Sequence, residues 1–137
     1  MNSRIEAFAI AAEQCVGVQY RLYGRDPAFG LDCVGLFLHA LRASCGTVPG
    51  TPRYGLRNTR YDYLPSLAKA AGFEAVTDDM RRGDCLCAVP GAGQMHIVIA
   101  LGRDLLVHAD ASQRKVVWSA TPIMWPVVHH FRFTERG

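Results

Sequence analysis

Apolar residues in the first part of the chain recur at helical spacing. Ser3 stands three residues before Glu6, the spacing of a capping box, and the periodic run that follows ends near Cys15. The apolar positions that share one face of this segment are Ile5, Phe8, Ala9, Ala12 and Val16. This pattern predicts a first helix that runs to about Cys15.

A second helix is predicted directly after Asp32, because aspartate is a favoured residue at a helix N-cap. Its apolar face comprises Val34, Phe37, Leu38, Leu41 and Cys45. Gly46 follows where a left-handed C-terminal cap is expected. Segments 17–31 and 46–60 are rich in glycine and proline and are predicted to be irregular, whereas 65–72 is predicted to be a short third helix.

From residue 73 onward the hydrophobic pattern changes from helical spacing to alternation. The segments predicted to be strands are 73–77, 84–89, 95–101, 105–109, 115–119 and 127–133. Short connections such as 102–104 favour antiparallel hairpins. Helices that come first and strands that follow predict an α+β fold, with N-terminal helices packed on a C-terminal antiparallel sheet.

Length and composition indicate one globular domain over residues 1–137. Half of the residues are apolar and a fifth are charged, which excludes disordered and coiled-coil classes. The formal net charge of +3 is too small to indicate a nucleic-acid partner. The uncharged stretch 85–102 is interrupted by proline and glycine, so we expect no membrane span.

The start of the chain contains an apolar run, residues 7–12, that is too short for a secretory signal. We therefore expect synthesis in the cytoplasm without a signal peptide. The five cysteines are an odd number in such a chain, which favours free thiols over a disulfide framework.

Cys33 is the cysteine best placed for chemistry. It follows the predicted N-cap, so its sulfur is expected at the first turn of a helix, where free N–H groups and the helix dipole lower the pKa of a thiol. The cysteines expected to be buried and structural are Cys15, Cys45, Cys85 and Cys87. A metal site built on Cys85, Cys87 and histidines is the alternative, but no second pair of such cysteines occurs. We expect no metal and no cofactor.

His96 and His108 lie on two strands joined by the turn near Gly102. A hairpin centred on Gly102 makes the two imidazoles direct cross-strand neighbours, and another loop length makes them diagonal neighbours. With Cys33 they supply a nucleophile, a base (His96) and a group that orients the base (His108). The histidines expected to have ordinary structural roles are His39, His129 and His130.

Three motifs carry a resemblance to a known family. Segments 16–24 and 31–36 read V-G-V-Q-Y-R-L-Y-G and L-D-C-V-G-L, segment 82–86 reads R-G-D-C-L, and His96-Ile97-Val98-Ile99 precedes His108-Ala109 by twelve residues. In order and spacing they resemble the NlpC/p60 papain-like cysteine peptidases. The resemblance covers about two-thirds of the chain.

The resemblance implies hydrolysis of peptide bonds in bacterial cell-wall peptidoglycan, commonly the link between D-γ-glutamate and a diamino acid. The matching positions make Cys33 the nucleophile, His96 the base and His108 the third polar residue. Tyr20 matches a tyrosine near the nucleophile, where its hydroxyl could assist an oxyanion, and Asp32 becomes part of the substrate-binding wall. The product is expected to form through a thioester acyl-enzyme.

The chain departs from the family pattern at three positions, Gln19, Arg25 and Val34, where the family commonly has Pro, Gly and Ser. These differences bear on substrate choice rather than on the triad. The segments 20–25 and 131–133 are similar to those of short single-domain members from phage tails and gene-transfer particles. This implies tail proteins as partners and action on the cell wall as part of a phage-like particle.

Two other functions share these features. A tail-tip structural or wall-binding module could keep the fold without catalysis. An acyltransferase would share the thioester step and pass the acyl group to a nucleophile other than water.

Overall fold

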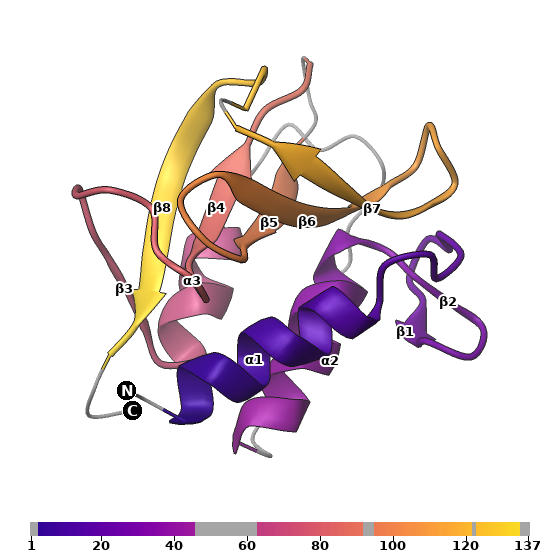
Figure 1. Ribbon diagram of the computed structural model, residues 1–137, viewed down its shortest axis with the longest axis horizontal. Coiled ribbons are helices and arrows are strands. Elements are labelled where there is room, and N and C mark those ends of the chain that lie inside the picture. Colours follow the sequence, from indigo (N-terminus) through magenta and orange to yellow (C-terminus); the bar gives the residue numbers. More distant parts are fainter. Residues whose placement is uncertain (1–2, 46–62, 92–94, 122, 135–137) are drawn as a thin grey trace.

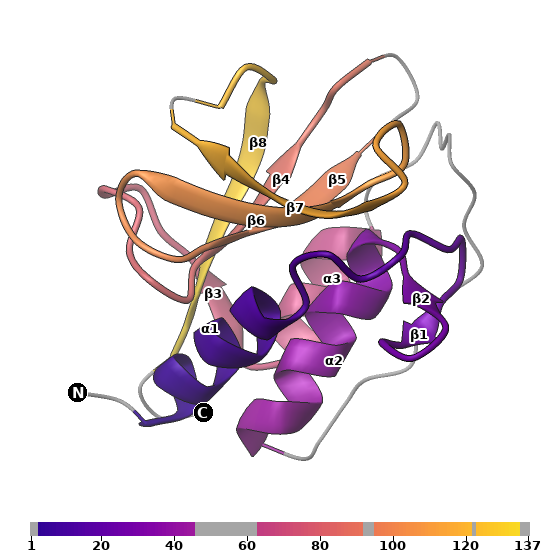
Figure 2. The same cartoon turned by 45° about the vertical axis from the view of Figure 1, so that its right-hand side comes forward.

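The computed structural model describes residues 3–45, 63–91, 95–121 and 123–134. Helices and sheet form two layers, with α1, α2 and α3 on one face of the sheet (Figures 1 and 2). The elements are α1 (Ser3–Gln14), β1 (Arg25–Asp26), β2 (Gly30–Leu31), α2 (Cys33–Cys45), α3 (Tyr63–Ala70), β3 (Phe73–Ala75), β4 (Cys85–Ala88), β5 (His96–Ala100), β6 (Leu105–Asp110), β7 (Lys115–Ala120) and β8 (Val127–Phe133). The predicted α+β order is confirmed. The predicted loop 46–60 and the cap at Gly46 lie outside the described residues.

The main sheet is antiparallel throughout and has the strand order β3-β8-β4-β5-β6-β7. Strands β4 to β7 follow one another as hairpins, as their short connections predict. The last strand, β8, returns to lie between β3 and β4 (Figure 1). This arrangement puts the start of β5 and the end of β6 in the middle of the sheet, close to α2.

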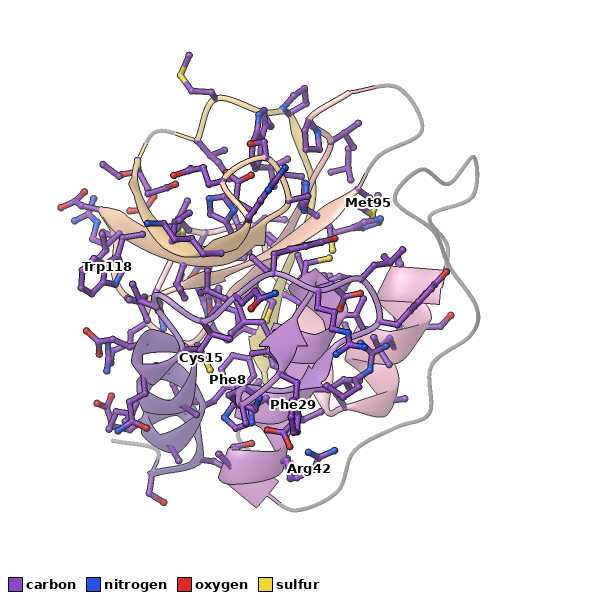
Figure 3. All side chains as sticks on the ribbon, turned by 90° about the vertical axis from the view of Figure 1, so that its right-hand side faces the viewer. Phe8, Cys15, Phe29, Arg42, Met95 and Trp118 are labelled. Carbon is purple, nitrogen blue, oxygen red and sulfur yellow. The ribbon has the colours of Figure 1, made fainter. Side chains whose placement is uncertain are left out.

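The main core lies between the helices and the sheet. Phe8 of α1 makes edge contacts with Phe37 of α2 and with Phe73 and Phe133, with ring centroids 5.2–5.9 Å apart. Figure 3 shows Phe8 and Cys15 pointing between α1 and the sheet, whereas Trp118 points away from it. Because each buried aromatic ring removes a large apolar area from water, this cluster fixes both helices on the sheet.

The other face of the sheet carries a smaller apolar cluster formed by Leu86, Val98, Ala100 and Leu106. Side chains alternate between the two faces of a strand. His96 therefore shares this face with Val98 and Ala100, and His108 shares it with Leu106. Met80 and Ile123 pack over the cluster from loops.

The hairpin of β5 and β6 differs from the predicted register. Ile99 pairs with Val107 and Ala100 with Leu106, and the Leu101 N–H donates to the Leu105 carbonyl at 2.9 Å. All of 102–104 is turn, so the hairpin is centred on Arg103. The expectation of a turn centred on Gly102, with His96 directly opposite His108, is wrong by one residue in the centre of the turn.

Residues 17–20 extend the sheet beyond β7, although the sequence predicts only a loop there. The Gly17 N–H donates to the Val116 carbonyl at 2.9 Å, and the Tyr20 N–H donates to the Arg114 carbonyl at 2.9 Å. Tyr20 also forms a parallel bridge with Leu31. This extension brings the residues just before α2 to the edge of the sheet.

Candidate active site

The start of α2 is held by the carboxylate of Asp32. This side chain is only 2% exposed. It accepts hydrogen bonds from the backbone N–H of Gly35 at 2.8 Å, the backbone N–H of Tyr23 at 2.9 Å and Nη1 of Arg25 at 3.1 Å. Asp32 is thus the N-cap, and Cys33 is the first residue of the helix, as predicted.

Close backbone packing fixes the loop 20–31 against this helix start. A Cβ on Gly35 would lie 1.9 Å from the Gly24 carbonyl oxygen, and a Cβ on Gly24 would lie 2.2 Å from the Gly30 carbonyl oxygen. Glycine is required at both positions because only a hydrogen atom fits there. Arg25, one of the departures from the family pattern, forms the ion pair with Asp32.

The Cys33 thiol lies in protein surroundings that favour its neutral form. Burial, and next the negative charge of Asp32, raise the pKa of Cys33 to about 12. Hydrogen bonding from the backbone N–H groups of Ile97, Val34 and Cys33 itself acts in the opposite direction. The expectation of a lowered thiol pKa is therefore wrong for the protein alone, because desolvation outweighs the helix terminus.

Tyr20 lies near this sulfur. Its pKa is raised by burial, and then by the charges of Cys33 and Asp32. The phenol therefore stays protonated and can donate a hydrogen bond. Tyr23, the other tyrosine in the motif, is 52% exposed and has a φ of 65°, so Tyr20 is the tyrosine associated with the site.

Both predicted histidines are neutral at pH 7. Burial lowers the pKa of His96, and His108 lowers it further. Burial also lowers the pKa of His108, which is 3% exposed. The carboxylate of Asp110, at the end of β6, raises the pKa of both rings in part. These mutual effects put His96, His108 and Asp110 in one electrostatic cluster.

Hydrogen bonds do not link the two imidazoles to each other. His108 Nε2 lies 2.9 Å from Ser119 Oγ. Within the described residues, the buried Nδ1 atoms of His96 and His108 have no hydrogen-bond partner. The ring of Trp125 instead contacts both: it stacks on His96 at 5.5 Å and 21°, and meets His108 at 5.5 Å and 79°.

The start of α2 meets β5 at Ile97. This strand pairs with β4 from His96 to Ile99, but with β6 only at Ile99 and Ala100. The first residues of β5, before Ile99, are not paired with β6. In this unpaired part the Ile97 N–H interacts with the Cys33 sulfur. Ile97 directly follows His96, so the start of α2 reaches the sheet at the residue next to His96.

The hydrophobic pattern and the motifs do not identify Asp110, Ser119 or Trp125 as neighbours of the two histidines. Ser119 lies on β7, two residues from Val117, which pairs with His108; with the correct strand pairs, alternation along β7 identifies it as a neighbour of His108. Asp110 shares the face of β6 with His108 by the same alternation. Trp125 lies in the irregular connection 121–126, where no periodic pattern applies.

The remaining cysteines and histidines have the structural roles expected where they are described. Cys15, Cys85 and Cys87 are buried in the main core, and His130 Nε2 lies 2.6 Å from the carboxylate of Asp84. Burial raises the pKa of Cys87, and so does its neighbour Cys33. Among the described residues no cluster of three or more His, Cys, Asp or Glu could hold a metal ion.

No helix in the described ranges is long and apolar enough to cross a bilayer.

Comparison with known proteins gives a family and a fold. The profile described as "NlpC/P60 family" matches residues 17–131. No curated protein sequence matches the chain significantly. Among solved structures, NlpC1 from Trichomonas vaginalis has 17% identity and a TM-score of 0.73, covering 97% of this chain and 45% of that chain.

Two shorter structures match over nearly their whole length. The NlpC/p60 domain of the peptidoglycan hydrolase SagA has 21% identity and a TM-score of 0.64, covering 92% of this chain and 96% of that chain. The P60 domain of an antigen from M. avium subspecies paratuberculosis has 23% identity and a TM-score of 0.64, covering 95% and 93%. At these identities the structures show a shared fold. Since the profile also spans most of the chain, this protein belongs to the NlpC/P60 family.

Proposed function

We propose that this protein is a cysteine peptidase that hydrolyses stem peptides of bacterial peptidoglycan. The observation that carries the proposal is the position of Cys33: the first residue of α2, its sulfur in contact with the backbone N–H of Ile97, next to His96. Nucleophilic catalysis by cysteine needs a thiol and a basic imidazole within reach of each other, and the place of His96 directly before Ile97 on β5 supports this pairing. Two of the similar structures are described as peptidoglycan hydrolases or domains of one.

The reaction begins from the neutral pair. Nδ1 of His96 has no hydrogen-bond partner among the described residues, so it is free to take the thiol proton. The thiolate attacks the substrate carbonyl carbon, the backbone N–H of Cys33 and the Tyr20 hydroxyl stabilise the oxyanion, and His96 returns its proton to the leaving amine as the C–N bond breaks. Water, deprotonated by His96, then hydrolyses the thioester, releases the acid and restores the thiol.

The neighbours of His96 support its charged form during this cycle. Asp110 raises the pKa of His96, which opposes the effect of burial. His108 is held by Ser119 through its Nε2 atom. In this proposal His108 is the third residue of the triad and orients His96 by packing. Asp32 is part of the wall of the substrate-binding cleft, where it holds the start of α2 and Arg25 in place.

The bond we assign is the link between D-γ-glutamate and the diamino acid, which the resemblance to the family supports. We further propose that a phage-like particle carries the enzyme to the cell wall, with tail proteins as partners. The support for this setting is the similarity of segments 20–25 and 131–133 to phage-associated members. In the structure, Phe131 and Phe133 are core residues, so these two aromatic side chains also serve the fold.

Incubation with defined stem peptides, followed by mass spectrometry of the fragments, tests the proposed function. Wild-type protein is expected to release the γ-glutamyl fragment, and Cys33→Ala is expected to lose all turnover. Cys85→Ala and Cys87→Ala are matched controls that remove buried sulfurs from the core and should keep most activity. Equal losses from all three variants would contradict the assignment of Cys33. Fragments that carry a second nucleophile in place of water would indicate acyl transfer.

A second candidate is a wall-binding module of the same fold without catalysis. A thiol that stays neutral even with substrate present would not attack a carbonyl. Sedimentation with purified cell walls distinguishes the two functions. Binding to the walls with no fragment released from them supports the module.

A further inference from the structure

Trp125 contacts both site histidines with its ring. It stacks on His96, with ring centroids 5.5 Å apart and planes inclined by 21°, and it meets the ring of His108 at 5.5 Å and 79°. Offset stacks and edge contacts are the arrangements that aromatic rings prefer at centroid separations of about 4.5–7 Å. The indole carries no proton in the proposed reaction, so these two contacts are not explained by the proton transfers.

Contacts on both sides of Trp125 fix its place in the fold. The Val89 N–H donates to the Pro126 carbonyl at 2.8 Å, which ties the connection to the end of β4. Ile123 packs on the apolar cluster of the sheet. The end of β4 also pairs with the first residue of β5 on one side and with the first residue of β8 on the other. The connection that leads into β8 therefore passes the start of β5, where His96 lies.

Hydrogen bonds leave the His96 imidazole incompletely fixed. Within the described residues, its buried Nδ1 atom has no partner. Burial, and next His108, lower the pKa of His96, so these surroundings disfavour the imidazolium that the proposed reaction forms. The face of an indole attracts a cation that lies within about 6 Å of its centroid. The stack on Trp125 therefore orients the ring and also favours its charged form.

The titratable groups that face His96 come from three of the described elements. Beyond burial, β6 supplies His108, which lowers the pKa of His96, and Asp110, which raises it. Cys33 at the start of α2 meets the residue after His96. β4 carries only two thiols, both buried in the main core on the other face of the sheet. The connection 121–126 contains no ionisable side chain, so it acts on the imidazole only through its aromatic ring.

We propose that Trp125 is a positioning residue for the base: its indole holds the plane of the His96 imidazole and stabilises the imidazolium while that ring carries the proton taken from Cys33. His108 is held at its Nε2 atom by Ser119 and contacts the same indole. The orienting effect of His108 on His96 then passes through Trp125. The inference rests on the proposed function and adds to it a residue outside the triad.

Proton NMR of the imidazole C2–H resonances follows the ionisation of His96 without any turnover, and His96→Gln identifies the resonance. Trp125→Leu keeps an apolar side chain but loses the π face, so we expect the titration midpoint of His96 to fall by about 0.5–1 pH unit. Trp125→Phe keeps an aromatic face and should restore at least half of this difference. Trp118→Leu is the matched control and should leave the midpoint unchanged, because Trp118 is exposed on β7 and points away from the core (Figure 3).

The emission of Trp125 gives a second readout in a protein that keeps this residue. The chain has two tryptophans, so Trp118→Phe leaves Trp125 as the sole one. Its emission should fall as pH drops below 6.5, because an imidazolium in contact with an indole quenches its fluorescence. Circular dichroism defines the pH range in which the protein stays folded. Adding His96→Gln should remove most of the fall, and a fall that persists without His96 would contradict the stacking contact.

Turnover of stem peptides tests the positioning role itself. Trp125→Leu is expected to lower kcat at least about tenfold with little change in KM, because a misplaced base transfers protons slowly. The decline of kcat/KM at low pH should move to lower pH together with the midpoint of His96. Trp125→Phe should keep kcat within about threefold of wild type. Equal losses of kcat in the two variants, with the midpoint of His96 unmoved, would indicate a packing role only and overturn the inference.

The NMR and turnover readouts separate the role of Trp125 from the proposed function. If the midpoint of His96 shifts as expected in Trp125→Leu while wild-type protein cleaves no peptide, the proposed function fails and the effect of Trp125 on the imidazolium stands. If wild-type protein cleaves the peptides and Trp125→Leu keeps both the wild-type kcat and the wild-type midpoint, the positioning role fails.

Discussion

The carboxylate of Asp32 accepts a hydrogen bond from the backbone N–H of Gly35 at 2.8 Å, across the first turn of α2. The same side chain, 2% exposed, also pairs with Arg25 at 3.1 Å. Because Cys33 lies between Asp32 and Gly35 in this capped turn, the position of the Cys33 side chain depends on a buried charge. The charge that holds the helix start is also one of the two causes that keep the thiol protonated.

Replacing Asp32 by Ala should therefore cost stability. It removes the N-cap and leaves the Tyr23 and Gly35 N–H groups without their acceptor, so we expect a loss of about 1–3 kcal/mol in the free energy of unfolding. Urea denaturation measures this loss. Asp104→Ala, at an exposed turn position, is the control and should change stability by less than about 0.5 kcal/mol. Equal losses would show that Asp32 does not hold the helix start.

Gly35→Ala tests the close packing of the loop 20–31 on α2. The added Cβ would lie 1.9 Å from the Gly24 carbonyl oxygen, so the backbone must move, and we expect a loss of about 2–3 kcal/mol or more. The matched control is Gly102→Ala, because a Cβ at Gly102 meets nothing within 4 Å. Urea denaturation of both variants compares them. A Gly35→Ala protein as stable as Gly102→Ala would mean that the loop is not held as described.

The two site histidines should make stability depend on pH. Burial lowers the pKa of His96 and of His108 below the usual 6.5. The unfolded chain then binds protons that the folded protein does not, so the free energy of unfolding falls as pH drops below about 6.5. Urea denaturation at pH 7.5 and at pH 5.5 measures this difference. The variant His108→Gln should show a smaller difference, and an unchanged one would exclude His108 as a source.

The same lowered pKa sets the acid limit of the proposed reaction. His96 must be neutral to accept the thiol proton, so kcat/KM should stay constant as pH falls to 6.5 and decline only below it. Removing the carboxylate of Asp110, which raises the pKa of His96 in part, should move the decline to still lower pH. A pH profile of Asp110→Asn against wild-type protein measures this shift, and a shift to higher pH would contradict the electrostatic role of Asp110.

The fold could be predicted from sequence because local patterns specify it. Alternating apolar positions located every strand of the main sheet, and Asp32 with the apolar face after it located α2. The register of β5 and β6 could not be predicted, since the pattern of alternating residues is the same for a turn centred on Gly102 or on Arg103. A shift of the centre by one residue moves the partner of each residue by two positions and preserves the face.

Motif and spacing identify candidate site residues but not their surroundings. Cys33, His96 and Tyr20 are candidates of this kind, and their catalytic roles stay a prediction. The raised pKa of Cys33 was not predicted, because a helix start predicts the local dipole while burial depends on β5, more than 60 residues away along the chain. The contact of Trp125 with both histidines was missed for a similar reason: its segment has no periodic pattern to place it.

The last prediction concerns the buried ion pair of Asp84 and Arg132, which lies far from Cys33 along the chain. Arg132 on β8 donates from Nε and Nη2 to the two carboxylate oxygens of Asp84, both at 2.8 Å, and the Asp84 side chain is 1% exposed. His130 and the Arg81 N–H also contact Asp84. Removing the carboxylate leaves the guanidinium without its main partner, so Asp84→Ala should cost about 3–5 kcal/mol.

Arg132→Met should cost less, because Asp84 keeps His130 and the Arg81 N–H as donors. The double variant should be more stable than the sum of the two single losses predicts, since neither charge is then left alone. Urea denaturation of the four proteins gives this coupling energy. Arg103→Ala, which breaks an exposed ion pair with Asp79 at 3.6 Å, is the control and should leave stability unchanged. Additive losses in the double variant would mean that Asp84 and Arg132 stabilise the sheet independently, through other contacts than their own ion pair.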